Sequence, residues 1–192
     1  MKESDMTPWT RRSLLVAAAS GGLVACTTNP SGAGLSARDK IDRDVDAALA
    51  DLYSNVPGAA ELGASAQGIL VIPKIRKAGF FASGSYGEGA LMIGPAKVDY
   101  YSLSSLGIGL TFGASEFNQA LFFMTPQALQ DFRVADGWEL GADAAVVVRS
   151  DGAAAGLAST QINRPITEVI FGQKGLIADA SLAGAKYSRI IR

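Results

Sequence analysis

The sequence predicts an α+β fold for one domain that follows an N-terminal export segment. A helical apolar period covers residues 36–66, and from residue 68 onward it gives way to short apolar runs bounded by glycine and proline, as in strands. The chain also contains 22 glycines, which suit closely packed, strongly bent strands better than long bundled helices.

The chain opens on a segment typical of a secretory leader. Arg11 and Arg12 precede an apolar run over residues 14–25, and small residues close it. A helix needs about 20 apolar residues to cross a bilayer, so this shorter run predicts a signal peptide and not a lasting span. Residues 10–15 also resemble a twin-arginine export signal, and the general secretory route remains the alternative.

Residues 23–26, Leu-Val-Ala-Cys, resemble a bacterial lipobox, in which a lipid is attached to the cysteine and the chain is cut before it. Cys26 is the only cysteine of the chain. Thr27 is not the aspartate that retains such lipoproteins at the inner membrane, so we expect the outer membrane. We therefore expect a leader over residues 1–25, a flexible tether over 26–37 and a single domain over 38–192.

Composition excludes several functions for this domain. Without residues 1–25, which hold three of the 17 basic and two of the 18 acidic side chains, 14 and 16 remain, a net charge of −2. Nucleic-acid binders normally carry a basic excess, so no nucleic-acid partner is expected. With no histidine and with Cys26 committed to lipid, we expect no metal, no cofactor and no disulfide.

The first helix is predicted to begin at Ser36, because Asp39 three residues later completes a capping-box pattern. Its apolar residues form one stripe, and its opposite face is mostly acidic. A helix that inserts into anionic lipid carries lysine and arginine on that face, so this helix is expected to pack on the domain. The stripe consists of Ile41, Val45, Ala48, Leu49 and Leu52.

Residues 55–58 predict a turn, with Pro57 at the first position of a short second helix over about residues 59–66. Residues 69–72 are a continuous apolar run, typical of a buried strand that ends at Pro73. Residues 86–89, Tyr-Gly-Glu-Gly, are expected to form a hairpin turn or a wide bulge. Gly94 and Pro95 end the following strand.

Further strands are predicted over residues 98–103, 107–112, 121–124, 142–148, 168–171 and 176–181. One helix interrupts them near residues 126–134. Thr125 can cap this helix, and Pro126 fits its first position.

Six blocks of the sequence stand out together, at residues 68–74, 84–89, 101–104, 123–132, 137–144 and 173–182. In collinear order, from about residue 37 to residue 192, they resemble the SYLF lipid-binding domain family. That family includes bacterial lipoproteins and the actin-binding endocytic adaptors of fungi and animals. The resemblance implies a glycine-rich, curved, mainly antiparallel and barrel-like sheet flanked by helices, and it implies binding of membrane phospholipid.

Lys74, Arg76 and Lys77 form the densest basic cluster of the predicted mature chain. We expect them to meet anionic lipid headgroups, joined by Lys174 or by the pair Lys186 and Arg189. Lysines at an anionic membrane surface contribute about 1 kcal/mol each. The alternative is a solvated strand end that discourages edge pairing.

Aromatic side chains could line a lipid cavity, but such residues more often form plain core. The residues concerned are Phe80, Phe81, Phe122, Phe123 and Trp138.

An enzymatic function is not expected. A serine nucleophile would need a lysine base, and the chain has neither a Ser-x-x-Lys motif nor a Gly-x-x-x-x-Gly-Lys-[Ser/Thr] phosphate loop. Two functions from different classes remain. The first is a lipid-anchored module that binds phospholipid headgroups without catalysis. The second is a structural protein of the bacterial envelope that acts through a protein partner or through self-association.

Overall fold

The computed structural model describes residues 35–79, 82–108, 113–139, 144–148, 164–175 and 184–192. The chain divides into two compact units, Met1–Gly34 and Leu35–Arg192, and all described residues belong to the second. The predicted leader, the lipobox with Cys26, and Phe80 and Phe81 therefore lie outside the described residues, as does the predicted strand over residues 176–181.

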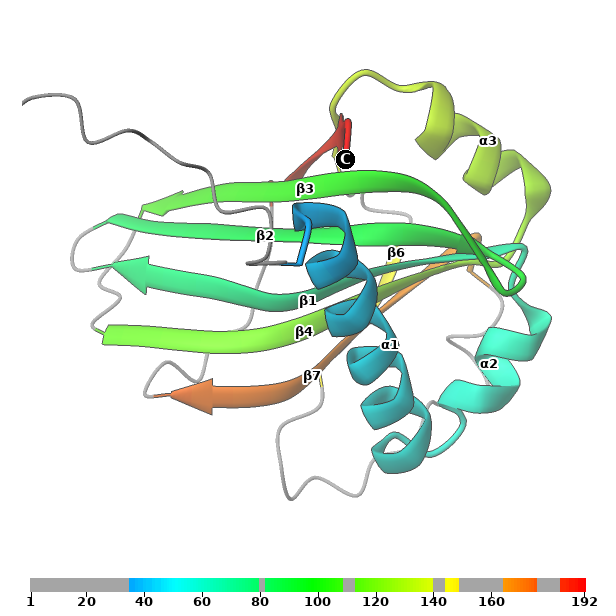
Figure 1. Ribbon diagram of the computed structural model, residues 1–192, viewed down its shortest axis with the longest axis horizontal. Helices are drawn as coiled ribbons and strands as arrows, with labels where there is room; N and C mark the ends of the chain where they lie inside the picture. Colours follow the sequence, from blue (N-terminus) through cyan, green and yellow to red (C-terminus); the bar gives the residue numbers. More distant parts are fainter. Residues whose placement is uncertain (1–34, 80–81, 109–112, 140–143, 149–163, 176–183) are drawn as a thin grey trace, which may run out of the picture. The chain divides into compact units, whose positions relative to one another are not determined.

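The second unit combines three described helices with one eight-stranded sheet (Figure 1). No helix in this described part is long and apolar enough to cross a membrane. The elements are α1 (Ala37–Asn55), α2 (Ala59–Ser65), β1 (Gly68–Gly79), β2 (Ala82–Ile93), β3 (Ala96–Ile108), β4 (Gly113–Phe123), α3 (Pro126–Val134), β5 (Trp138–Glu139), β6 (Ala144–Val148), β7 (Ile166–Gly175) and β8 (Lys186–Ile190).

The strands lie in the order β5-β8-β3-β2-β1-β4-β7-β6. Every neighbouring pair is antiparallel except β6 and β7, which are parallel. The long central strands bend along their length, and α1 crosses one face of the sheet (Figure 1). The predicted α+β class with a curved, mainly antiparallel sheet is confirmed.

Apolar side chains cover both faces of the sheet. On one face, the stripe of α1 packs on residues such as Val71 and Phe122. On the other face, Phe132 of α3 packs with Phe123, and its ring also meets the ring of Trp138 edge-on at 5.3 Å between centroids. The interpretation of these aromatic residues as core is confirmed for Phe122 and Phe123, which are fully buried on opposite faces of the sheet, and Trp138 packs against the cluster that contains Phe123.

Helix α1 begins where the sequence predicts. The Ser36 side chain accepts a hydrogen bond from the Asp39 main-chain N–H at 3.1 Å, and the Asp39 carboxylate accepts one from the Ser36 main-chain N–H at 3.2 Å. This reciprocal pair is a complete capping box. Helix α3 is also confirmed, with Thr125 as its cap and Pro126 in its first turn.

Helix α2 covers the predicted residues, but Pro57 is not its first residue. The helix is preceded by Gly58, whose φ of 84° lies in the left-handed region, so Pro57 belongs to the turn before it. Glycine adopts such a φ without the steric cost that a Cβ imposes.

Strand β1 does not end at Pro73, contrary to prediction. It continues to Gly79 through an irregularity at Pro73 and Lys74, where the register with β4 shifts between Ile72 and Ile75. Lys74 has a φ of 51°, unusual for a residue with a Cβ. Proline has no N–H to donate, and a bulge is one of the few sheet positions that tolerates this.

Of the two alternatives predicted for residues 86–89, the hairpin turn is wrong, because these residues lie in the middle of β2. An irregularity does lie at this place in the sheet, since the register of β1 with β2 shifts between Val71 and Arg76, opposite residues 86–90. Their glycines are needed for close packing. A Cβ on Gly89 would overlap the Val71 carbonyl oxygen and lie 2.8 Å from the Ile72 Cα, and one on Gly87 would lie 2.8 Å from the side chains of Ile72 and Ile75. The turn after this strand, at Gly94 and Pro95, is confirmed.

Two further boundaries differ from prediction. The strands expected over residues 98–103 and 107–112 are joined in β3, which is continuous to Ile108, while residues 109–112 lie outside the described part. The C-terminal strand β8 was not predicted, because Lys186–Ile190 alternates polar and apolar residues over only five positions.

Candidate functional site

A groove of about 530 Å³ opens between the second half of α1 and strands β1, β4 and β7. Charged and amide side chains from all four elements surround it. Its lining includes Asp44, Asp51, Lys74, Glu116, Asn118 and Lys174.

Lys74 enters this groove because of the bulge in β1. Its main-chain N–H donates to Asn118 Oδ1 at 2.9 Å, which replaces the ladder hydrogen bond that the bulge removes. Its ammonium group donates to Asp44 Oδ1 of α1 at 2.7 Å. Since the Lys74 side chain remains 55% exposed, it still faces solvent at the groove.

Arg76 follows Lys74 by two residues on β1, and Glu116 lies opposite Arg76 on the neighbouring strand β4. Arg76 Nε lies 3.5 Å from Glu116 Oε2, and the arginine side chain is 81% exposed. Glu116 of β4 is in turn directly opposite Lys174 of β7 in the sheet register. Two of the predicted cations, Lys74 and Lys174, are thereby brought to one groove, with Arg76 beside the carboxylate that lies between their strands.

Gly172 opens the floor of the groove at a second irregularity, where the register of β4 with β7 shifts between Glu116 and Asn118. Its φ is 62°, and a Cβ there would lie 2.7 Å from Asn118 Nδ2 and 3.4 Å from Asp51 Oδ2. The other oxygen of Asp51 accepts a hydrogen bond from Asn55 Nδ2 at 2.7 Å. The missing side chain at position 172 thus leaves an amide and a carboxylate accessible in the groove.

The remaining predicted cations lie elsewhere. Lys77 is only 5% exposed and shares the opposite face of the sheet with Ile75, because side chains alternate along β1. Lys186 and Arg189 lie on β8, which is separated from β7 by four strands. Arg189 and Arg133 both pair with the buried carboxylate of Asp99, so this arginine has a structural partner.

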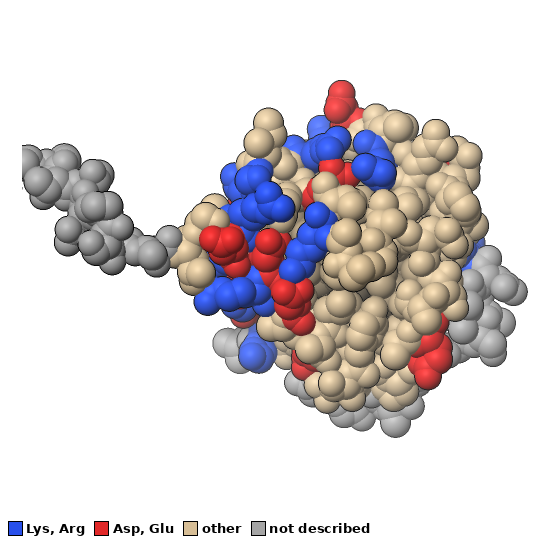
Figure 2. All heavy atoms as spheres, turned by 45° about the vertical axis from the view of Figure 1, so that its right-hand side comes forward, with Lys and Arg blue, Asp and Glu red and all other residues tan. Residues whose placement is uncertain are grey.

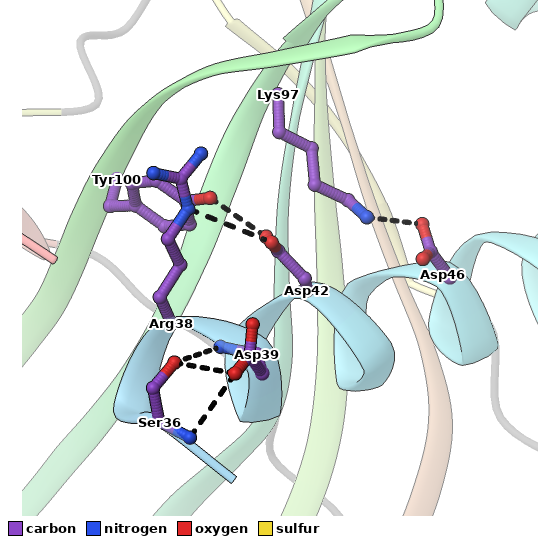
Figure 3. Close-up of polar contacts among 7 residues, drawn as sticks. All are labelled: Ser36, Arg38, Asp39, Asp42, Asp46, Lys97 and Tyr100. Carbon is purple, nitrogen blue, oxygen red and sulfur yellow. Dashed lines mark hydrogen bonds and ion pairs between the residues drawn. The ribbon is translucent and has the colours of Figure 1, made fainter.

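The acidic face of α1 is held against the sheet by basic and hydroxyl groups (Figure 3). Lys97 Nζ lies 2.6 Å from Asp46 Oδ1, and the Tyr100 hydroxyl donates to Asp42 Oδ1 at 2.8 Å. Burial and this hydrogen bond raise the pKa of Tyr100 above its ordinary value. The expectation that α1 packs on the domain is confirmed, and its acidic side chains bind to Lys97 and Tyr100 of β3.

Basic and acidic side chains are mixed on the surface. Figure 2 shows blue and red groups interleaved on one side of the face in view, beside a broad area without charge. Lys74 pairs with Asp44 and Arg76 pairs with Glu116, so the basic cluster of the sequence does not form a patch of one sign. Within the described part of the chain, no three acidic side chains are placed to hold a metal ion.

Sequence reasoning predicted only Lys74 and Lys174 of the groove and missed its other polar residues and its glycine, among them Asp51, Asn118 and Gly172. Asp51 was read only as part of an acidic helix face, and nothing in the local sequence distinguishes Asn118 from an ordinary strand residue. The only signal was the Gly172 position itself, since a glycine inside an apolar strand run marks a bulge or a close approach.

The described part of the chain combines a curved, mainly antiparallel sheet with a polar groove beneath its N-terminal helix. Residues 104–189 match the family described as "Ysc84: Las17-binding protein actin regulator", which is the SYLF family. This match agrees, over residues 104–189, with the resemblance seen in the sequence motifs.

A relative from Aeromonas veronii, named Beta cell expansion factor A, is 29% identical over 152 residues. The alignment covers 79% of this chain but 56% of the relative, so this chain spans little more than half of that protein's length.

Proposed function

We propose that this protein is a lipid-anchored bacterial lipoprotein whose SYLF domain binds phospholipid headgroups, without catalysis, at the groove beneath α1. The single observation that carries the proposal is the convergence of Lys74 and Lys174, from strands far apart in sequence, on one open groove. The SYLF family is one of non-enzymatic binding domains, which supports a binding role.

The groove has the size and chemistry for a headgroup. Sites for small ligands typically measure about 300–1,000 Å³, and this groove lies within that range. Lysine binds phosphate as a compact point charge, and an amide N–H such as that of Asn118 adds direction.

The anchor is proposed from the sequence alone. Cleavage before Cys26 and acylation of its thiol would hold the domain beside a bilayer, and Thr27 favours the outer membrane. Membrane attachment by the acyl chain would then supply the affinity, and the groove would supply the choice of lipid. A single headgroup contact is weak, but a domain anchored beside the membrane meets its lipid ligand at a high effective concentration.

The second candidate is a protein partner in the envelope. The description of the matched family names Las17 and actin regulation, which are protein interactions of other members. The same domain in this chain could therefore act through a protein or through a second copy of itself.

Vesicle co-sedimentation separates the two. The full chain carrying Cys26→Ser, which removes the acyl anchor, is mixed with vesicles of phosphatidylethanolamine and phosphatidylglycerol. We expect binding that the double variant Lys74→Gln/Lys174→Gln reduces about thirtyfold, because two lysines that contribute about 1 kcal/mol each near a phosphate surface are lost together. Lys40→Gln, an exposed lysine of α1 outside the groove, is the control and should bind normally.

High salt should weaken the binding, because exposed charges are screened. A stable oligomer that binds no vesicle, or a double variant that binds like the control, would contradict the proposal and favour the protein partner.

A further inference from the structure

The groove does not have the charge balance of a site for a purely anionic ligand. Its lining contains three carboxylates, from Asp44, Asp51 and Glu116, and two ammonium groups, from Lys74 and Lys174. A headgroup that carried only negative charge would meet more repulsion than attraction from these side chains.

Most of these charges already pair with one another, and the pairing shows which groups remain for a ligand. Lys74 is bonded to Asp44, and Glu116 lies beside Arg76. Lys174 forms no ion pair with any other described residue, and Asp51 Oδ2 faces the opening at Gly172. Lys174 is therefore the ammonium group of the groove without an ion pair to another described residue, and Asp51 Oδ2 is a carboxylate oxygen directed at its opening.

An amide donor completes the set. The Lys74 main-chain N–H can only donate, so the atom of Asn118 that faces it must be Oδ1, and Nδ2 is turned toward Gly172. Gly172 and Lys174 are two residues apart on β7, at most about 7 Å along the strand. An ammonium donor, a neutral amide donor and a carboxylate acceptor thus lie within the reach of one small molecule.

We infer that the groove binds a phosphate ester with a primary ammonium group, the headgroup of phosphatidylethanolamine. Lys174 Nζ and Asn118 Nδ2 donate to the phosphate oxygens, and the ligand ammonium donates to Asp51 Oδ2. This inference rests on the proposed function and specifies the lipid. It also changes the sequence-based expectation of anionic headgroups to that of a zwitterionic one.

The same chemistry excludes close alternatives. The choline headgroup carries three methyl groups in place of N–H donors, so it can neither donate to Asp51 nor fit as closely. The glycerol headgroup of phosphatidylglycerol has no cation, and it would leave the Asp51 carboxylate unpaired beside a phosphate.

The test compares phosphatidylcholine vesicles that contain an equal fraction of either phosphatidylethanolamine or phosphatidylglycerol. The probe protein is the full chain with Cys26→Ser. We expect about tenfold tighter binding to the phosphatidylethanolamine vesicles, the equivalent of one charge-assisted hydrogen bond. Asp51→Asn keeps the side-chain shape but removes the charge, and it should abolish this preference. Glu61→Gln, exposed on α2 and outside the groove, should not.

Soluble glycerophosphoethanolamine serves as the competitor, and displacement of the protein from the vesicles would support recognition of the headgroup itself. Equal binding to both lipids, unchanged by Asp51→Asn, would overturn this inference and leave the proposed function standing. Binding of the soluble compound without binding of vesicles would contradict a membrane lipid as the natural ligand. Absence of binding in every arm would overturn both.

Discussion

The side chain of Gln119 in β4 donates a hydrogen bond from Nε2 to the Tyr187 hydroxyl of β8 at 2.7 Å. Three strands, β1, β2 and β3, separate these two in the sheet. The sheet must therefore curve until side chains of its two halves meet across the concave face. The same Nε2 also donates to the buried carboxylate of Glu168 on β7.

Glu168 makes the stability of the domain depend on pH. The side chain is 1% exposed, and burial raises its pKa above the ordinary value although the hydrogen bond from Gln119 opposes this. In the unfolded chain the group loses its proton at a lower pH, so stability falls as pH rises through the interval between the two pKa values. Below that interval both states are protonated and the effect disappears.

We therefore expect Glu168→Gln to raise the midpoint of thermal unfolding at neutral pH and to leave it nearly unchanged at about pH 4, near the ordinary glutamate pKa. Thermal unfolding followed by circular dichroism across this range measures the effect. Glu61→Gln, on an exposed helix position, is the control. A variant less stable than the parent at neutral pH would show that ionised Glu168 is favourable.

The same substitution, glycine to alanine, should reduce stability strongly at one position of β2 and hardly at all at another. Gly89→Ala should destabilise the domain by more than about 3 kcal/mol, because the new methyl group would collide with main-chain atoms of β1 that cannot move independently. Gly84→Ala in the same strand has its nearest neighbour, Leu106 Cδ2, at 3.9 Å and should change stability by less than about 0.5 kcal/mol. Denaturant unfolding of both variants decides this, and equal effects would refute the packing role of Gly89.

The capping box of α1 gives a third expectation. Ser36→Ala removes the acceptor for the Asp39 main-chain N–H and should cost about 1 kcal/mol. Ser54→Ala, at an exposed position in the last turn of the same helix, should cost much less. Comparison of the two unfolding free energies isolates the cap, and a loss of stability shared by both variants would argue against it.

The lipid anchor is tested on protein from its native host. Mass spectrometry should find a chain that begins at Cys26 and carries acyl mass on that residue. Retention of residues 1–25, or an unmodified thiol, would remove the anchor from the account while leaving the groove and its ligand open to test.

Local signals predicted much of this fold. Ser36, Asp39, Thr125 and Pro126 act through neighbours within one helical turn, so the helix starts could be read from the sequence. The roles of Gly87 and Gly89 could not be read in the same way. Both glycines make room for β1, which is their neighbour in the sheet and not in the local sequence. A pattern of glycines in sequence does not distinguish a turn from a tight contact between strands.

The groove could be predicted only in part, for a related reason. The run Lys74, Arg76, Lys77 looks like one cluster in sequence, but alternation along β1 and the bulge at Lys74 send Lys77 to the opposite face. The joining of Lys174 to Lys74 depends on the strand order β1-β4-β7, and the carboxylates of α1 arrive from a different part of the chain. Neither the meeting of the two lysines nor the position of these carboxylates can be predicted from the spacing of residues in the sequence.

The most direct measurement of the central claim is an NMR titration of the ¹⁵N-labelled full chain carrying Cys26→Ser. Dihexanoyl phosphatidylethanolamine and dihexanoyl phosphatidylglycerol are added in turn below their micelle concentrations. Headgroup binding at the groove predicts saturable amide shifts that centre on Lys74, Asn118 and Gly172 with at least one of the two lipids. Shifts that centre instead on the concave face around Gln119 and Tyr187, or none with either lipid, would contradict it.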